Sequence, residues 1–208
     1  MTEAARPTKR GRETLEAIHA AARKLIAEKG FLKTTLSDIV KEAGKSPASF
    51  YNYYDSKEAL LEHWAREFQR EARERLLVAE ANSPSDPRSR VGIAARAHWE
   101  TYRERLAEMV GVYQLAMVND DFAKVWDSIC EEPVAGIARS IVRAQSRGYC
   151  PGLDPRLAAE AIVAMLNQFC YEKLANGRAA TVDDEACIAT LADMWFRSIY
   201  WKPDDASA

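Results

Sequence analysis

The chain has 208 residues, enough for one large or two small domains with a real core, and its 48% hydrophobic and 29% charged content is ordinary for a globular protein in water. No stretch approaches the run of about eighteen apolar residues that a membrane-spanning helix needs. The net charge of −2 argues against a surface that binds nucleic acid over its whole extent.

The charge is unevenly distributed along the chain. Residues 1–60 carry 11 Lys+Arg and 8 Asp+Glu, whereas the remainder carries 18 and 23. A mildly basic N-terminal part on an acidic remainder fits a protein that touches phosphate at one end only. The segment 1–11 reads as disordered and, with Arg12, holds a basic cluster that is either a solvated tail or an arm meeting phosphates or a minor groove. It also lacks the apolar core of a signal peptide, so we expect a cytoplasmic protein.

A first helix is predicted from about Glu13 to Lys29, where Gly30 ends its apolar stripe. The next segment, 34–58, reads TTLSDIVKEAGKSPASFYNYYDSKE and carries two sets of helix-start signals. Thr35 and Asp38 have the spacing of a capping box.

Gly44 is a helix stop, and Ser46 with Pro47 is an N-cap followed by proline at the first helical position. Two short helices joined by a glycine turn outline a helix-turn-helix. Asp55 and Glu58 form a further candidate capping box, at the start of the next helix.

The second short helix carries a more specific pattern, SFYNYY at 49–54 followed by SKEALL at 56–61. It resembles the signature of the tetracycline-repressor (TetR) family of bacterial transcription regulators, and the resemblance covers about residues 12–61. In that family the second helix of the motif reads the major groove. The resemblance implies phosphate contacts from Thr34, Thr35, Tyr51, Tyr53 and Lys57, and positions near the bases for Ser46, Pro47, Ala48, Ser49 and Asn52.

Lys45 departs from the family pattern, which usually has a small apolar residue there. Either its stem packs while the ammonium reaches water, or it adds a phosphate contact. Aromatic residues on a short helix are more often core than binding surface. Phe50 and Tyr54 lie four apart and are expected to face the core, which leaves Tyr51, Asn52 and Lys57 outward.

The rest of the chain reads as helix throughout. Pro133 is expected to kink or interrupt the predicted helix at 121–147. The predicted helices are about 55–82, two within 88–119, 121–147, 155–175 and 182–201. The prediction is an all-α fold of about nine helices: a three-helix DNA-binding head at 1–58, and a helical ligand-binding and dimerisation body at 59–208.

Residues suited to catalysis or metal binding are scattered. The three histidines lie on separate predicted helices without metal-ligand spacing, and the four cysteines form no C-x-x-C pair. No glycine-rich loop for a nucleotide is present. We therefore expect no enzyme activity, no metal, no cofactor and reduced thiols.

The middle helices are rich in aromatic residues and methionine, which suits an adaptable apolar cavity as well as a plain core. Three polar residues are embedded in these patterns and could orient a ligand. The candidate ligand-binding residues are His98, Trp99, Tyr102, Tyr113, Met117, Trp126, Met165, Asn167, Gln168 and Phe169.

The resemblance implies a homodimer formed by the last two helices, 155–175 and 182–201, on an inverted-repeat operator in double-stranded DNA. A charge at Trp195 or Ile199 would then split the dimer. The sequence thus predicts a transcription regulator, most simply a repressor released when a largely apolar small molecule binds. The alternative is a helical small-molecule carrier or interaction module that retains the head.

Overall fold

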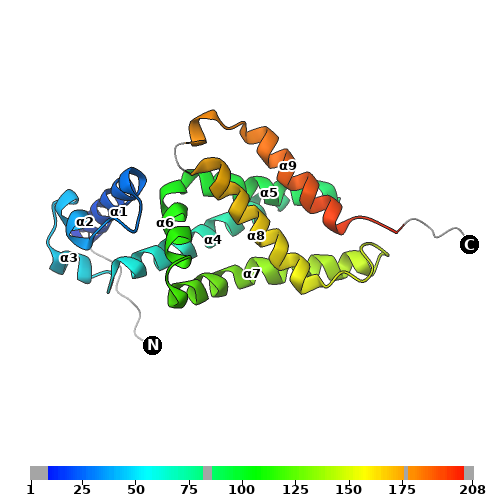
Figure 1. The fold of residues 1–208 in the computed structure, drawn as a ribbon, viewed down its shortest axis with the longest axis horizontal. Coiled ribbons are helices and arrows are strands. Elements are labelled where there is room, and N and C mark those ends of the chain that lie inside the picture. The colour runs from blue at the N-terminus through cyan, green and yellow to red at the C-terminus, as the bar shows by residue number, and fades with distance from the viewer. Residues whose placement is uncertain (1–8, 82–85, 176–177, 204–208) are drawn as a thin grey trace, which may run out of the picture. The chain divides into compact units, whose positions relative to one another are not determined.

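The computed structural model describes residues 9–81, 86–175 and 178–203, and within them it is all-helical, as predicted (Figure 1). The helices of this described part are α1 (Lys9–Lys29), α2 (Leu36–Glu42), α3 (Pro47–Tyr51), α4 (Lys57–Ala81), α5 (Pro87–Glu104), α6 (Leu106–Ala116), α7 (Asp120–Gln145), α8 (Pro155–Leu174), the short 3-10 helix η1 (Arg178–Thr181) and α9 (Asp184–Ile199). None of the helices searched is long and apolar enough to cross a membrane.

The chain divides into two compact units. The first contains the described residues up to Ala65 together with Ala107–Trp126, so α6 belongs to the same unit as α1, α2 and α3. The second contains 66–106 and the described residues from Asp127 onward. The chain passes from one unit to the other within α4, at the start of α6 and within α7.

Local capping fixes the helix-turn-helix in the first unit. Thr35 and Asp38 form the predicted capping box at the start of α2. At its end, the Gly44 N–H donates to Lys41 O and the Lys45 N–H donates to Val40 O, a Schellman motif that needs the positive φ of Gly44, +62°. Ser46 then caps α3, as predicted.

The core of the first unit is apolar and closely packed. Its largest fully buried side chains come from α1, the turn after it, α2, α3, α4 and α6: Ile18, Phe31, Ile39, Phe50, Leu60, Leu61, Trp64 and Met109. Phe50 is fully buried and Tyr54 is 9% exposed, which confirms the inward face predicted for this segment.

In the second unit α5 packs against both α8 and α9 (Figure 1). Ion pairs join α5 to the last helix, including Arg96 to Glu185 and Arg88 to Asp193. The side chains are partly exposed, so each pair stabilises the packing only modestly.

Several boundaries differ from the sequence prediction. Helix α1 begins at Lys9, not Glu13, so Lys9, Arg10 and Arg12 belong to a helix; Arg6 lies outside the described residues. Ser56, not Asp55, caps α4, because its Oγ accepts the Ala59 N–H. Pro133 lies inside an uninterrupted α7.

Candidate DNA-binding surface and effector-binding core

Helix α3 presents one face to the surroundings. Pro47, Ala48, Tyr51 and Asn52 are exposed, with Tyr51 at 56%, whereas Phe50 anchors the opposite side in the core. The five-residue helix is fixed at its start by Ser46, whose Oγ accepts the Ser49 N–H. Such a short, anchored helix with small and hydrogen-bonding side chains outward has the form needed to enter a major groove.

Two other predicted DNA contacts also hold the head together. The Tyr53 hydroxyl donates to Gly11 O at 2.9 Å, which ties the turn after α3 to the first turns of α1. The Lys57 Nζ donates to Thr34 O at 3.0 Å and lies over the Phe31 ring. Because an ammonium has three donors, Lys57 can hold these groups and still reach a phosphate.

The two predicted threonines behave differently. Thr34 is fully buried and its hydroxyl donates to Gly30 O at 2.8 Å, so its side chain is not available to a phosphate, a correction to the prediction. Thr35 is exposed, and its hydroxyl caps α2. Of the two threonines, Thr35 is therefore the one whose side chain a phosphate could meet.

Lys45, which departs from the family pattern, lies in the turn between α2 and α3. It is the second residue after the C-cap of α2, where a side chain commonly packs back on the last turn of the helix. A half-exposed lysine can place its methylene stem there and keep its ammonium in water.

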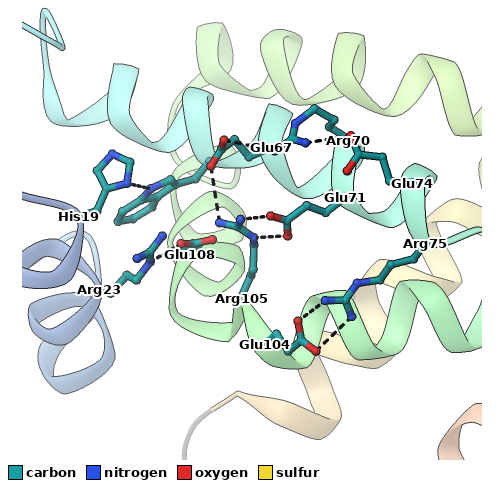
Figure 2. A network of polar contacts seen from close by, with 11 residues as sticks. His19, Arg23, Glu67, Arg70, Glu71, Glu74, Arg75, Glu104, Arg105 and Glu108 are labelled. Atoms are coloured by element: carbon teal, nitrogen blue, oxygen red, sulfur yellow. Dashed lines mark hydrogen bonds and ion pairs between the residues drawn. The ribbon is translucent and has the colours of Figure 1, made fainter. Parts of the chain in front are cut away.

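Buried polar groups of the first unit are bonded to one another. His19 Nε2 lies 2.7 Å from the Tyr54 hydroxyl, and the Trp64 indole N–H points to His19 Nδ1 at 3.5 Å. Since an indole nitrogen only donates, Nδ1 accepts and Nε2 carries the hydrogen. Arg23 Nε donates to the buried Glu108 at 2.5 Å (Figure 2).

The second unit differs in this respect. His98 Nε2, Trp99 Nε1 and Asn167 Oδ1 are buried atoms without a hydrogen-bond partner among the residues that the structure describes. Burial lowers the pKa of His98 to about 4, so its ring is neutral at physiological pH. Burial also raises the pKa of Cys130 to about 12, more than its contact with Asn167 lowers it, so this thiol too is uncharged.

Aromatic rings surround these groups. His98 lies against Phe68 and Tyr102, with ring centroids 5.5 Å and 6.2 Å away, and Trp99 lies 6.2 Å from Phe169. The environment is thus apolar and uncharged, with hydrogen-bonding atoms from α5 and α8. Groups of these kinds orient mostly apolar molecules in binding sites.

The other predicted ligand residues are placed less uniformly. Tyr113, Met117 and Trp126 belong to the first unit. Met117 is 66% exposed, and Gln168 is exposed and hydrogen-bonded to Glu172, so neither lines an enclosed cavity, which corrects the prediction. Met165 is half-buried on α8.

The outer faces of the last two helices carry small and apolar side chains. The exposed positions include Leu157, Ala161 and Ala164 on α8, and Ala186, Ala189, Thr190 and Met194 on α9. Trp195 and Ile199, by contrast, are 8% and 0% exposed and belong to the protomer's own core. The choice of these two residues as dimer contacts was therefore wrong.

Sequence reasoning missed Glu108 and Gln114 of α6, which contact Arg23 and the Phe31 N–H. Both are polar residues in the otherwise apolar segment LAEMVGVYQLA. That interruption was the only signal in the sequence that these positions have partners.

Comparison with known proteins relates both halves of the chain to regulators. Residues 18–63 match the family of bacterial regulatory proteins of the tetR type, and residues 91–201 match the C-terminal domain of the transcriptional regulator EthR. The transcriptional regulator EthR of Mycolicibacterium smegmatis is 26% identical over 94% of this chain and 89% of its own length. The regulator BetI of Rhizobium meliloti is 26% identical over 86% of this chain and 85% of its own length.

Solved structures share the fold. A putative TetR-family regulator from Syntrophomonas wolfei superposes with a TM-score of 0.76 at 16% identity, covering 93% of this chain and 99% of its own. FadR from Bacillus subtilis, solved in complex with stearoyl-CoA, superposes with a TM-score of 0.70 at 19% identity, and the match covers 89% of this chain and 100% of FadR. The matched relatives are transcription regulators, not enzymes.

Proposed function

The chain belongs to the TetR family of DNA-binding transcription regulators, and we propose that it is a dimeric repressor that leaves its operator when a neutral, mostly apolar molecule binds its second unit. The observation that carries the DNA-binding part is the capped helix α3, whose Ala48, Tyr51 and Asn52 face outward. Because bacterial operators lie in the cytoplasm, we place the protein there.

The effector's chemistry follows from the buried atoms of α5 and α8. The Trp99 N–H requires an acceptor, the Asn167 oxygen requires a donor, and the His98 ring is uncharged. A ligand with an apolar body and one neutral group that both accepts and donates would satisfy them, whereas a charged group would meet no opposite charge among these three. That FadR from Bacillus subtilis was solved with stearoyl-CoA supports an apolar body for the effector.

The proposed dimer uses the outer faces of α8 and α9. Small side chains such as Ala161, Ala164 and Ala186 allow close approach of a symmetry-related pair of helices. Two recognition helices would then meet half-sites one helical turn apart, or a multiple of about 10 base pairs.

Selection of bound duplexes from a random DNA pool tests the function. We expect an inverted repeat to be enriched, and sedimentation to give a dimer. Ala161→Asp, which places a charge on the exposed face of α8, should give monomers that no longer bind this repeat. Enrichment of no sequence would contradict the regulator and favour the carrier alternative. Mass spectrometry of the purified protein for co-purifying molecules would then identify the ligand in either case.

A further inference from the structure

One face of α6 contacts α1, α4 and the turn after α1. Glu108, Gly111 and Gln114 are three residues apart and therefore share a side of the helix. Glu108 is only 2% exposed, and its Oε1 accepts from Arg23 Nε at 2.5 Å, which joins α6 to α1 (Figure 2).

The middle of this face approaches its neighbours closely. A Cβ on Gly111 would lie 3.1 Å from Leu61 Cδ2 and 3.4 Å from Phe31 Cβ. Glycine therefore permits α6 to lie against α4 and against the turn after α1.

Gln114 binds that turn directly. Its Oε1 accepts the Phe31 N–H at 3.0 Å. The approach depends on Gly30, which has a φ of +80° and whose added Cβ would lie 3.2 Å from the same oxygen. Gln114 is thus fitted to the backbone of residues 30 and 31.

Lys57 also contacts this turn, through backbone carbonyl groups. Its Nζ donates to Thr34 O at 3.0 Å and lies 3.4 Å from Phe31 O. The turn continues directly into Thr35, the N-cap of α2. Any change in how Gln114 holds Phe31 therefore acts on the residue that begins the helix-turn-helix and on Lys57.

The start of α6 is linked to the second unit by the chain itself. Arg105, the C-cap of α5, immediately precedes α6, and its guanidinium pairs with Glu71 and Glu67 of α4 (Figure 2). With 15% exposure it is well shielded, and hydrogen bonding to it lowers the pKa of the Glu71 carboxyl. A rearrangement of α5 consequently reaches α6 at its first residue.

We propose that Gln114 is a positioning residue that conveys the state of the second unit to the DNA-contacting groups, through its hydrogen bond to the Phe31 N–H. This inference rests on the proposed function, because it gives the route by which effector binding changes DNA binding. Linkage requires DNA to change the effector's affinity by the same factor, and if the route runs through Gln114, DNA bound to α3 should stabilise α6.

Hydrogen exchange of the full chain, with and without the selected DNA duplex, tests this converse and requires no effector. In the wild type, DNA should slow exchange in peptides from α3 and also in peptides from 106–116, the latter by about fivefold or more, the lower end of typical coupling. Gln114→Leu has no acceptor for the Phe31 N–H, so it should keep the protection of α3 and lose that of α6. Gln114→Glu retains an acceptor oxygen and should keep both.

The outcomes separate the two proposals. If no duplex is selected, the proposed function fails. If a duplex is selected but the wild-type α6 is not protected, or Gln114→Leu is protected as strongly as the wild type, the role of Gln114 is overturned. Should Gln114→Leu fail to fold, Gln114→Asn withdraws the acceptor by one methylene without an apolar replacement, and the same comparison applies to it.

Discussion

The two units differ in how completely their buried polar side chains are hydrogen-bonded. In the first, His19 bonds to both Tyr54 and Trp64, and Glu108 bonds to Arg23. In the second, three buried atoms on α5 and α8 have no hydrogen-bond partner in the described part of the chain.

The difference matches what each unit has to do. A paired network favours a single geometry, because each group left without its partner would cost about 1–3 kcal/mol. A DNA-binding head needs that fixed geometry. Unpaired atoms in an apolar surrounding carry this cost in the absence of a ligand, and a ligand that pairs them removes it.

The ion pair of Arg23 and Glu108 gives the largest expected effect. Arg23→Ala removes the guanidinium that pairs with the Glu108 carboxylate, which is 2% exposed, and should lower the free energy of unfolding by about 3 kcal/mol. Urea unfolding measures this. The matched control is Arg75→Ala, which removes a pair whose Glu104 is 61% exposed and should cost less than about 1 kcal/mol. Equal losses of stability in the two variants would show that the Arg23–Glu108 pair contributes no more than a surface ion pair.

Acid should weaken the second unit through His98. Its pKa is lowered from 6.5 to about 4 in the folded state, so below pH 6.5 the unfolded chain takes up a proton that the folded chain does not. The free energy of unfolding should therefore fall as pH falls, by about 2 kcal/mol between pH 6.5 and pH 5. His98→Phe should remove this part of the pH dependence, which denaturant titrations at several pH values would measure. Parallel curves for the wild type and the variant would contradict a buried neutral ring.

A substitution at Asn167 is expected to raise the free energy of unfolding rather than lower it. Asn167→Leu replaces a buried amide, whose oxygen is unpaired, by an apolar side chain of similar size, and should raise the free energy of unfolding by about 1–2 kcal/mol. Gln168→Leu, at the exposed neighbouring position, should change it by less than about 0.5 kcal/mol. Stabilisation by Asn167→Leu together with loss of ligand binding would mark a group kept for function. A clear destabilisation would mean that its contact with Cys130 is structural.

The sequence predicted the helix-turn-helix well because its determinants are local. Thr35 with Asp38, and Ser46 with Pro47, act within three residues, so their spacing already specifies the caps. The continuity of α7 was missed because a proline lacks the backbone N–H that a helix interior uses and commonly interrupts a helix. Here α7 continues through Pro133.

The sites were less predictable because their contacts join distant residues. Gln114 and Phe31 are 83 positions apart, and no local pattern connects them. The outward position of Thr34 was carried over from the family pattern, whereas a hydrogen bond to Gly30, four residues earlier, buries it. Met117 was assigned from residue type alone, which does not indicate that this residue, just after the end of α6, is exposed.

Tyr51 and Tyr54 give the smallest effect on stability and the finest separation of roles, because they lie three residues apart and differ in environment. Tyr54→Phe removes the hydroxyl bonded to His19 and should lower the free energy of unfolding by about 1 kcal/mol. Tyr51→Phe removes a hydroxyl from a side chain that is 56% exposed and should leave stability unchanged within about 0.5 kcal/mol. Their effects on DNA should be reversed: Tyr51→Phe should lose the predicted phosphate contact and weaken binding to every sequence alike, while folded Tyr54→Phe should bind as the wild type does. Denaturant unfolding and fluorescence anisotropy with the selected duplex would measure the two quantities. If Tyr54→Phe weakened DNA binding as much as Tyr51→Phe, the buried network would not merely support the DNA-binding surface but would determine its geometry.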